Sequence, residues 1–368
     1  MSNSNKFGLH LALNSLSFGN VSILLLKTLW EREKNGENID WFLSPIGNID
    51  FSAEKENKEF QVWIQSKMVK AFESWSRHYP VFKSWHLNGS IESISNDPTL
   101  LTFYELDKPT KVELNIARNN KTCFTSKYTC DIFKLFGVES TYLPLAFDSY
   151  NFSRLEKKFH HDDRIVFNLC GKFERRKHTE KVIKTWIKKY GGSRKYVLQC
   201  AIYNPFFNEQ QNSSLIASAV SGNKPFNVVF YPRMKENNIY NEFLNSGNII
   251  LDMSGGESWS LPSFQSIAIG KHSVILNAHV FKDWANNKNS VLVNPSSQIN
   301  AADGVFFKDG DSFNIGNLFD WNEDDFIEGC EKAIARVESN PLNSEGLSLQ
   351  TEYSKEKFAD SVVNLLKI

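Results

Sequence analysis

Residues 164–190 read RIVFNLCGKFERRKHTEKVIKTWIKKY, and this stretch decides how we expect the chain to fold. Arg164 to Leu169 is a short and mostly apolar run, which predicts a buried strand. A charged loop from Gly171 to Lys177 follows it, and the segment from Glu180 to Tyr190 predicts a helix. A strand, a loop and a helix in this order form the repeating unit of a parallel α/β sheet.

The same alternation extends in both directions from this unit. We expect further strands at residues 7–13, 39–43, 100–104, 121–126, 195–201, 226–231, 249–253 and 273–276. We expect further helices at residues 21–33, 59–79, 127–136, 239–244, 262–269, 324–338 and 354–366. The apolar positions of the second of these helices are Val62, Ile64, Val69, Phe72 and Trp75. The polar segment Asn151 to Asp163 has no strand pattern and is interpreted as a linker. The predicted fold class is therefore α/β, with two Rossmann-like domains at residues 1–150 and 151–351.

The composition excludes several classes of protein. A chain of 368 residues with 41% hydrophobic and 23% charged residues suits two folded domains rather than a disordered chain. A net charge of zero argues against nucleic acid as the partner, although a local basic patch would escape this count. Five cysteines without a CxxC pair predict reduced thiols. The N-terminus lacks a signal-peptide pattern, and the apolar run 21–29 is too short to cross a bilayer. We therefore expect a cytoplasmic protein without membrane insertion, leaving peripheral association with a membrane open.

The charged loop after the strand at 164–169 is the first motif with chemical meaning. It contains four cations, Lys172, Arg175, Arg176 and Lys177, and begins with Gly171. A loop between a strand and a helix directs backbone N–H groups and a helix N-terminus towards an anion. Four cations at such a place suit a diphosphate, while the alternative is a solvated charge run without a ligand.

The second motif follows the strand predicted at 249–253 and reads GGESWSLPSFQ from Gly255 to Gln265. Glycines allow the backbone to approach a ligand closely. Glu257 can accept hydrogen bonds from sugar hydroxyls, and Gln265 offers both a donor and an acceptor. Pro262 is suited to the first turn of a helix. The alternative is an ordinary polar loop that leads into a helix.

These two motifs in this order resemble those of the retaining GT-B glycosyltransferases, which build glycans from nucleotide sugars. That family has two glutamates separated by seven residues, and this chain has Glu257 and Gln265 at the two positions. The resemblance implies that Glu257 faces the donor sugar and that Gln265 meets the ribose with a neutral amide in place of a carboxylate. It also implies donor contacts from the segment between them, at Gly256, Ser258, Trp259, Ser260 and Leu261.

The resemblance assigns roles to the basic loop and to the first half as well. Lys172 and Lys177, with Gly171, stand where the family neutralises the diphosphate leaving group. Gly19, in Ser17-Phe18-Gly19-Asn20, stands at the family's first glycine loop, and Glu105 stands near the acceptor hydroxyl. A carboxylate at this strand end is equally a helix cap or an ion-pair partner. The family fold implies two domains facing across a cleft, with residues 352–368 packing back on the first domain.

Three further features are weaker candidates. His86 follows a possible strand end and is interpreted as an acceptor-side residue or a structural histidine. Arg233, after the strand predicted at 226–231, is within reach of a phosphate or a base edge. The run His160 to Asp163 has the composition of a metal site but lacks helical ligand spacing, so we expect a solvated loop.

The sequence therefore predicts an enzyme that moves a sugar from a nucleotide-sugar donor to an acceptor, with retention. The acceptor is open among a glycan, a lipid-linked glycan, a protein and modified DNA. We expect no cofactor and no metal, because the lysines are available for the diphosphate. The alternative is a degenerate GT-B protein that binds a sugar nucleotide or a partner protein without catalysis.

Overall fold

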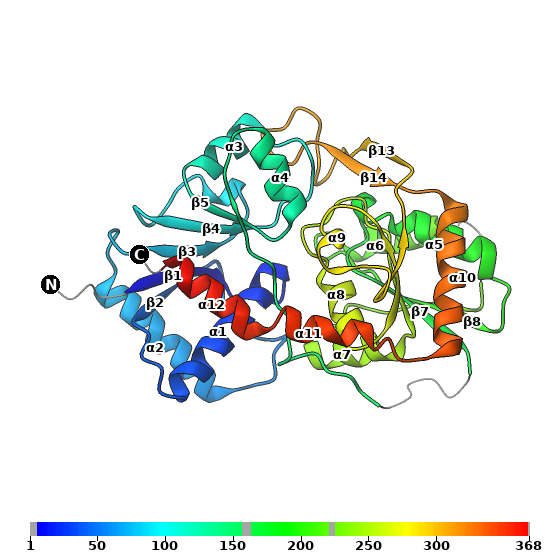
Figure 1. Cartoon of the computed structure of the whole chain (residues 1–368), viewed down its shortest axis with the longest axis horizontal. Coiled ribbons are helices and arrows are strands. Elements are labelled where there is room, and N and C mark those ends of the chain that lie inside the picture. The colour runs from blue at the N-terminus through cyan, green and yellow to red at the C-terminus, as the bar shows by residue number, and fades with distance from the viewer. Residues whose placement is uncertain (1–5, 157–162, 221–224, 367–368) are drawn as a thin grey trace. The chain divides into compact units, whose positions relative to one another are not determined.

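The computed structural model describes residues 6–156, 163–220 and 225–366 (Figure 1). The chain forms two compact units. The first unit comprises Met1–Tyr150, Ser312–Asn314 and Tyr353–Ile368, and the second comprises Asn151–Asp311 and Ile315–Glu352. The sequence-based boundary lay between residues 150 and 151, with residues 352–368 returning to the first domain. The short segment 312–314 of the first unit had no counterpart in that prediction.

The first unit is built on a sheet of six parallel strands. The strands are β1 (Phe7–Ala12), β2 (Trp41–Ile46), β3 (Val81–Ser84), β4 (Pro98–Thr102), β5 (Lys121–Phe124) and β6 (Thr141–Tyr142). Their order in the sheet is β2-β1-β3-β4-β5-β6. The strand order therefore reverses next to β1, and loops that leave the carboxyl ends of β1 and β3 diverge there.

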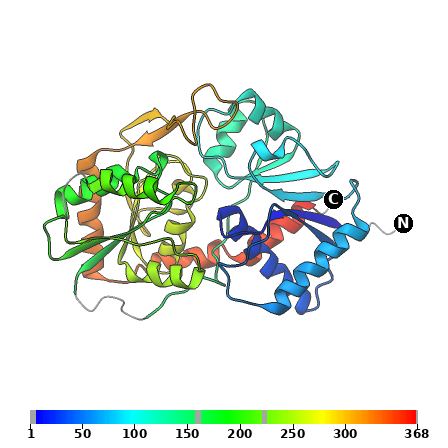
Figure 2. The ribbon, with the colours of Figure 1, turned by 180° about the vertical axis from the view of Figure 1, so that it is seen from behind.

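Helices pack on this sheet and close the first core. They are α1 (Ser17–Lys34), α2 (Lys58–Ser74), α3 (Lys111–Arg118), α4 (Lys127–Leu135) and α12 (Lys355–Leu366), with the short 3₁₀ helix η1 (Asn88–Ser90). The C-terminal helix α12 lies beside α1 in both views (Figures 1 and 2). It buries Phe358, Val362 and Leu366, and Lys355 forms an ion pair of 2.8 Å with Glu31 of α1. Helix α12 is thus part of the first core although it ends the chain.

The second unit repeats this architecture with another six-stranded parallel sheet. The strands are β7 (Ile165–Cys170), β8 (Tyr196–Ala201), β9 (Val228–Phe230), β10 (Ile249–Asp252), β11 (His272–Leu276) and β12 (Val291–Val293). Their order is β12-β11-β10-β7-β8-β9. The order reverses between β7 and β10, so the two predicted motifs leave the sheet at this switch point, side by side.

The remaining elements of the second unit surround this sheet. The helices are α5 (Thr179–Tyr190), α6 (Glu209–Val220), α7 (Asn237–Ser246), α8 (Leu261–Ala268), α9 (Phe281–Trp284), α10 (Glu323–Ser339) and α11 (Leu349–Glu352). Short 3₁₀ helices are η2 (Arg175–Lys177) and η3 (Glu345–Ser348). Helices α5 and α6 lie side by side (Figure 2). Strands β13 (Ser297–Asn300) and β14 (Asn317–Asp320) form a separate antiparallel pair.

Several sequence-based boundaries were wrong. Helix α1 begins at Ser17 instead of residue 21, so Gly19 lies in its first turn, where a side chain would meet the Asn14 carbonyl oxygen at 2.0 Å. Helix α2 ends at Ser74 instead of residue 79, and no range was predicted for the strand β3 that follows, whose end before His86 was only a possibility. The elements α3, α6, α9, α11, β6 and β12 to β14 were not predicted either. Most of these elements are short, and a short segment carries too few periods to be read from its sequence. Helix α6 has twelve residues, but the residues that it buries are Asn212 and Ala219, so its sequence shows no apolar face.

The apolar positions of α2 were also misleading. Ile64 is buried, but Val62 and Val69 are exposed, and Phe72 is 95% exposed. The buried face of the helix runs through Phe60, Ile64 and Lys67, which are spaced for one side of a helix.

Two other features concern regions outside the sheets. His160, His161 and Asp162 lie outside the described residues. Within the described parts of the chain, no helix has the length and apolar character needed to cross a membrane.

Candidate functional site

The basic loop begins at the end of β7 with a glycine that the structure requires. Gly171 has φ +113, in the region where residues other than glycine are strained. A side chain at this position would also lie 3.1 Å from the Lys177 side chain, which covers the glycine. The chain then turns through η2 and enters α5 at His178, whose φ is +51.

Five charged side chains alternate in sign across this loop and the neighbouring one. In order they are Lys172, Glu174, Arg176, Glu257 and Lys177, which we call the alternating charge chain. Lys172 pairs with Glu174 at 2.7 Å, and Arg176 pairs with Glu174 at 3.2 Å. Arg176 also pairs with Glu257 at 2.9 Å, and Lys177 forms a short ion pair with the same Glu257 oxygen. Three cations and two carboxylates give the group a charge of +1.

The middle of the alternating charge chain is deeply buried. Arg176 is 3% exposed and Glu257 is 5% exposed. Burial by itself would raise the pKa of Glu257, but the charges of Arg176 and Lys177 outweigh burial and hold the pKa at about 2. Burial would likewise raise the pKa of Glu174, and Arg176 and Lys172 lower it. Both carboxylates are therefore ionised at neutral pH.

The loop that carries Glu257 is held by hydrogen bonds to its carbonyl groups. The His279 Nε2 atom donates to the Ser254 carbonyl at 2.8 Å, since a carbonyl can only accept. The Gly255 carbonyl accepts from the Phe319 amide at 2.8 Å. The Gly256 carbonyl accepts from Arg176 at 2.6 Å, and the Trp259 carbonyl accepts from the Trp284 indole at 3.2 Å. A loop fixed at four carbonyls is preorganised before any ligand binds.

Gly255 shows how closely the two loops approach. Its amide donates to the Arg176 carbonyl at 2.8 Å, which joins the second motif to the basic loop. A side chain at Gly255 would lie 2.3 Å from the Phe319 carbonyl oxygen and 2.7 Å from His178 Nε2. Glycine is therefore required here by space rather than by its φ angle.

The structure places the residues that follow Glu257 in the interior. Ser258, Trp259 and Ser260 are buried, and Leu261 is half-buried at the start of α8. The Trp259 ring packs against Phe264 with a centroid distance of 5.1 Å, so Trp259 contributes to the core of the unit as well as to the loop.

Gln265 occupies the second motif position on α8 and is 3% exposed. Its Oε1 atom is buried and has no hydrogen-bond partner among the residues that the structure describes. A buried amide oxygen without a partner is costly, and such an atom often awaits a ligand or a water molecule.

Lys172, at the other end of the alternating charge chain, lies among aromatic rings. Its ammonium is 5.2 Å from the centroid of the Phe206 ring and 5.6 Å from that of Phe306. These contacts and the Glu174 ion pair orient Lys172 without burying it, since its side chain is 37% exposed. Arg233 follows β9 and is exposed.

Solved structures share the fold of this chain, although its sequence alone finds no relative. No family model and no curated protein matches the chain. Sucrose-phosphate synthase from Thermosynechococcus elongatus aligns over 98% of both chains with 13% identity and a TM-score of 0.64. A glycosyltransferase from Rickettsia africae aligns over 99% of this chain and 98% of its own, with 9% identity and a TM-score of 0.65. HepE from Anabaena, solved in complex with UDP, aligns over 98% and 99% of the two chains, with 12% identity and a TM-score of 0.59.

The chain has the GT-B fold. The fold prediction is confirmed, with two parallel six-stranded α/β units of the kind seen in GT-B glycosyltransferases. Identities of 9–13% establish the fold and leave donor, acceptor and stereochemistry as matters for proposal.

The predicted residues of the first unit gather at the carboxyl edge of its sheet. Phe18, next to Gly19, stacks on Phe103 at a centroid distance of 4.0 Å and meets the ring of His86 at 4.6 Å. His86 is exposed just after β3, and Glu105 is half-buried after β4. This GT-B unit therefore brings Gly19 and His86 together at its own switch point, beside β1 and β3.

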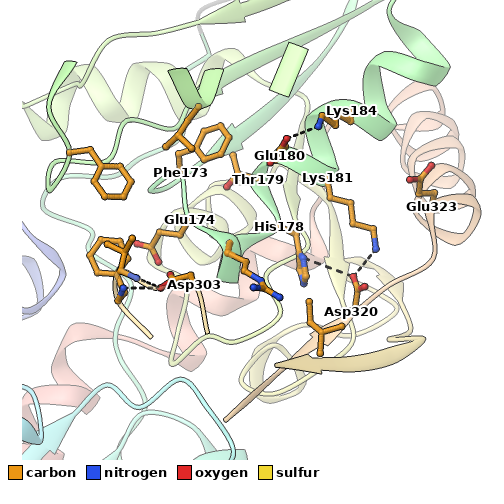
Figure 3. A pocket seen from close by; sticks show the side chains of 16 residues that line it. Phe173, Glu174, His178, Thr179, Glu180, Lys181, Lys184, Asp303, Asp320 and Glu323 are labelled. Atoms are coloured by element: carbon orange, nitrogen blue, oxygen red, sulfur yellow. Dashed lines mark hydrogen bonds and ion pairs between the residues drawn. The ribbon is translucent and has the colours of Figure 1, made fainter. Parts of the chain in front are cut away.

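A cavity of 660 Å³ lies next to the basic loop in the second unit (Figure 3). Glu174 and His178 line it, together with Asp320, which accepts a hydrogen bond from Lys181 at 2.6 Å. Neither Lys177 nor Glu257 is among its lining residues. We therefore place the candidate site at the alternating charge chain, where both motif loops meet, and not in this cavity.

Sequence reasoning missed two residues of the site. Arg176 was counted only as one of four basic residues, yet it contacts both carboxylates of the alternating charge chain. Asp252 was read only as part of a strand. It is the last residue of β10, and its carboxylate accepts hydrogen bonds from three serines of the second motif and its flank, Ser254, Ser260 and Ser263. An aspartate at the carboxyl end of a buried strand was the available signal. Within the described residues, no group of three or more His, Cys, Asp or Glu side chains has the geometry of a metal site.

Proposed function

We propose that this chain is a glycosyltransferase that takes a sugar from a nucleotide-sugar donor bound to the second unit and transfers it, with retention, to an acceptor. The acceptor class is a glycan, a lipid-linked glycan, a protein or modified DNA. The observation that carries the proposal is the convergence of Arg176 and Lys177 on an ionised, buried Glu257 at the switch point of a GT-B unit.

The arrangement of the alternating charge chain suits the reversible binding of a diphosphate. Lys172 and Lys177 are its two ends, and Arg176 is its centre. When the lysines turn to a diphosphate, Arg176 still pairs with both Glu174 and Glu257. Lys172 and Lys177 can therefore move from the carboxylates to the phosphates while each carboxylate keeps Arg176 as a partner. A buried carboxylate without any partner would be costly.

The same arrangement stabilises the charge that develops during transfer. The bond between the anomeric carbon and the diphosphate oxygen breaks, and the diphosphate leaves with the electron pair. Lys172 and Lys177 neutralise that charge, which is the largest electrostatic demand of the reaction. Glu257 orients the sugar through its hydroxyls, and Gln265 binds the ribose through its free amide oxygen or its NH₂ group. The acceptor oxygen bonds to the anomeric carbon and gives its proton to an oxygen of the departing diphosphate. Glu105 of the first unit is the proposed acceptor-side carboxylate.

Nucleoside diphosphate binding tests the proposal directly. A panel of nucleoside diphosphates and nucleotide sugars in a thermal-shift assay identifies the base, because a ligand that binds the folded state raises Tm. Lys177→Ala should weaken binding of the active nucleoside diphosphate by about 10- to 100-fold, the size of a lost charge-assisted hydrogen bond. Lys188→Ala is the control, since Lys188 lies on α5 and pairs with the exposed Glu323 at 3.2 Å.

The outcomes separate the proposal from its alternatives. Unchanged affinity in both Lys172→Ala and Lys177→Ala would contradict the assignment of the diphosphate to this loop. Binding of nucleotide sugars without hydrolysis or transfer would indicate a GT-B protein that has kept binding and lost catalysis. Proton NMR of the released sugar at early times reports the anomeric configuration, and an inverted product would overturn retention.

A further inference from the structure

The loop between β10 and α8 has an unusual backbone. Among the described residues other than glycine, four have a positive φ: His178, Ser260, His279 and Asn314. The first three border this loop. Ser260 has φ +63 and ψ +71 and immediately precedes α8. Such a conformation is unfavourable for serine and persists only where surrounding contacts enforce it, which is common at functional sites.

The contact that enforces it is made by Asp252. The Asp252 Oδ1 atom accepts from the Ser254 amide at 3.2 Å and from the Ser254 hydroxyl at 2.6 Å. The other oxygen, Oδ2, accepts short hydrogen bonds from the hydroxyls of Ser260 and Ser263. We call these four residues the Asp252–serine network. All of them are buried, so the hydrogen bonds form away from competing water.

The network closes the loop on itself. The Asp252 carboxylate, at the end of β10, accepts hydrogen bonds from three places along the loop. They are Ser254 near its start, Ser260 at its end and Ser263 in the first turn of α8. Glu257 lies midway between Ser254 and Ser260, the two anchored positions. The hydroxyl of Ser260 is directed to Asp252 and not to the N–H groups of α8, for which it makes no cap.

We propose that Asp252 is a positioning residue that holds Glu257 in place for catalysis through Ser254, Ser260 and Ser263. This inference rests on the proposed function, because it assigns Asp252 a task at the donor site. The other anchors of the loop act on its carbonyls from Arg176, His279 and Trp284. Asp252 acts instead on the two ends of the loop, and it sets the path between them. Loss of Asp252 therefore displaces Glu257 without removing any group that touches the donor.

The test compares Asp252→Ala with Asn227→Ala as a matched control. Asn227 is buried in the same unit, just before β9. It donates three hydrogen bonds of 2.9–3.0 Å to carbonyls between the end of α5 and the first residue of β8, at the opposite end of the strands from Asp252. Donor hydrolysis in Asp252→Ala should show kcat lowered by about 10- to 100-fold, the effect of misplacing a reacting geometry by about 1 Å. Affinity for the nucleoside diphosphate should stay within about threefold. Asn227→Ala should lower Tm and leave kcat unchanged.

Two further variants keep the result interpretable. Asp252→Asn retains the shape and one acceptor oxygen, so it should recover part of kcat if Asp252→Ala folds poorly. Ser260→Ala should lower kcat severalfold in the natural chain but less than twofold in the Asp252→Ala background, because the serine acts through Asp252. A kcat within twofold of the natural chain in Asp252→Ala, or strictly additive effects of the two substitutions, would overturn the proposal.

A readout that needs no activity separates this inference from the proposed function. Amide hydrogen exchange in residues 254–263 should be faster in Asp252→Ala than in the natural chain, and unchanged in Asn227→Ala. If the natural chain neither binds nucleoside diphosphates nor hydrolyses a donor, the proposed function fails whatever the exchange shows. If the chain is active and exchange in this segment does not change in Asp252→Ala, Asp252 does not position the loop.

Discussion

Replacing Arg176 by methionine removes the central cation of the alternating charge chain while keeping much of its volume. Two carboxylates lose a partner at once, because the Arg176 guanidinium pairs with Glu174 at 3.2 Å and with Glu257 at 2.9 Å. The Gly256 carbonyl loses its hydrogen bond as well. Each carboxylate retains one lysine, so neither is left without any counter-charge.

The expected loss of stability follows from burial. Removing one partner of a buried ion pair destabilises a protein by about 3–5 kcal/mol. The charges of Arg176 and Lys177 hold the pKa of Glu257 below its usual value, so the ionised carboxylate stabilises the folded chain. This contribution is fully present above pH 4.5 and is lost as the pH falls towards 2. In Arg176→Met the pKa of Glu257 should rise, so the stability lost between pH 4.5 and pH 2 should shrink.

Urea titrations at pH 7, 4.5 and 2.5, followed by tryptophan fluorescence, measure both effects. Arg176→Met should be about 3–5 kcal/mol less stable than the natural chain at pH 7. The stability of Arg176→Lys should lie between that of Arg176→Met and that of the natural chain. Lysine keeps the positive charge but lacks the guanidinium that bridges two carboxylates. Arg336→Met is the control, since Arg336 donates to the Asn287 and Lys288 carbonyls and its loss should cost about 1 kcal/mol. A loss below 1 kcal/mol in Arg176→Met, with an unaltered pH dependence, would refute this account of the alternating charge chain.

Three other predictions concern the donor. Glu257→Gln should lower turnover by about 100-fold or more while nucleoside diphosphate affinity changes little, since we propose that Glu257 faces the sugar; equal losses for both ligands would place it at the nucleotide. Gln265→Glu should tighten nucleoside diphosphate binding by at most about tenfold, because a carboxylate makes the stronger hydrogen bond to ribose. Isothermal titration of the natural chain and of Gln265→Glu measures this difference in affinity. Without ligand, Gln265→Glu should have a lower Tm, since it buries a charge at a position that is 3% exposed. Dialysis against EDTA should leave donor hydrolysis unchanged, because in the proposed function Lys172 and Lys177 supply the charge that a metal would bring; loss of activity that Mg²⁺ or Mn²⁺ restores would contradict this.

The order of elements was predictable because the information for it is local. In the sequence, the longer strands of the two sheets are apolar runs of a few residues, and a polar loop follows each of them. Gly137, with φ +71, ends a helix where the sequence placed that end. Gly171 begins the basic loop at a position where only glycine is unstrained. From such signals the two α/β halves and the two motif loops follow without knowledge of any contact.

The face that a helix buries was less predictable. In α2 the exposed residues Val62 and Phe72 are apolar, while Lys67 is buried and pairs with Glu33 at 2.6 Å. The positions of these apolar residues therefore predict the wrong side of α2 as the buried one. The partner that makes burial of Lys67 possible lies 34 residues away, and no local pattern contains it.

The sequence by itself determined the alternation of strands and helices, the glycines at the turns and the residue types of the two motifs. Only the tertiary structure decided which of those residues work together. Arg176 reaches Glu257 across 81 positions of sequence, and it does so because β7 and β10 are neighbours at the point where the strand order reverses. Asp252 gathers three serines because the loop folds back over the end of its strand. The physical reason is that ion pairs and buried hydrogen bonds depend on distance in space, which the strand order sets and the spacing of residues along the chain does not.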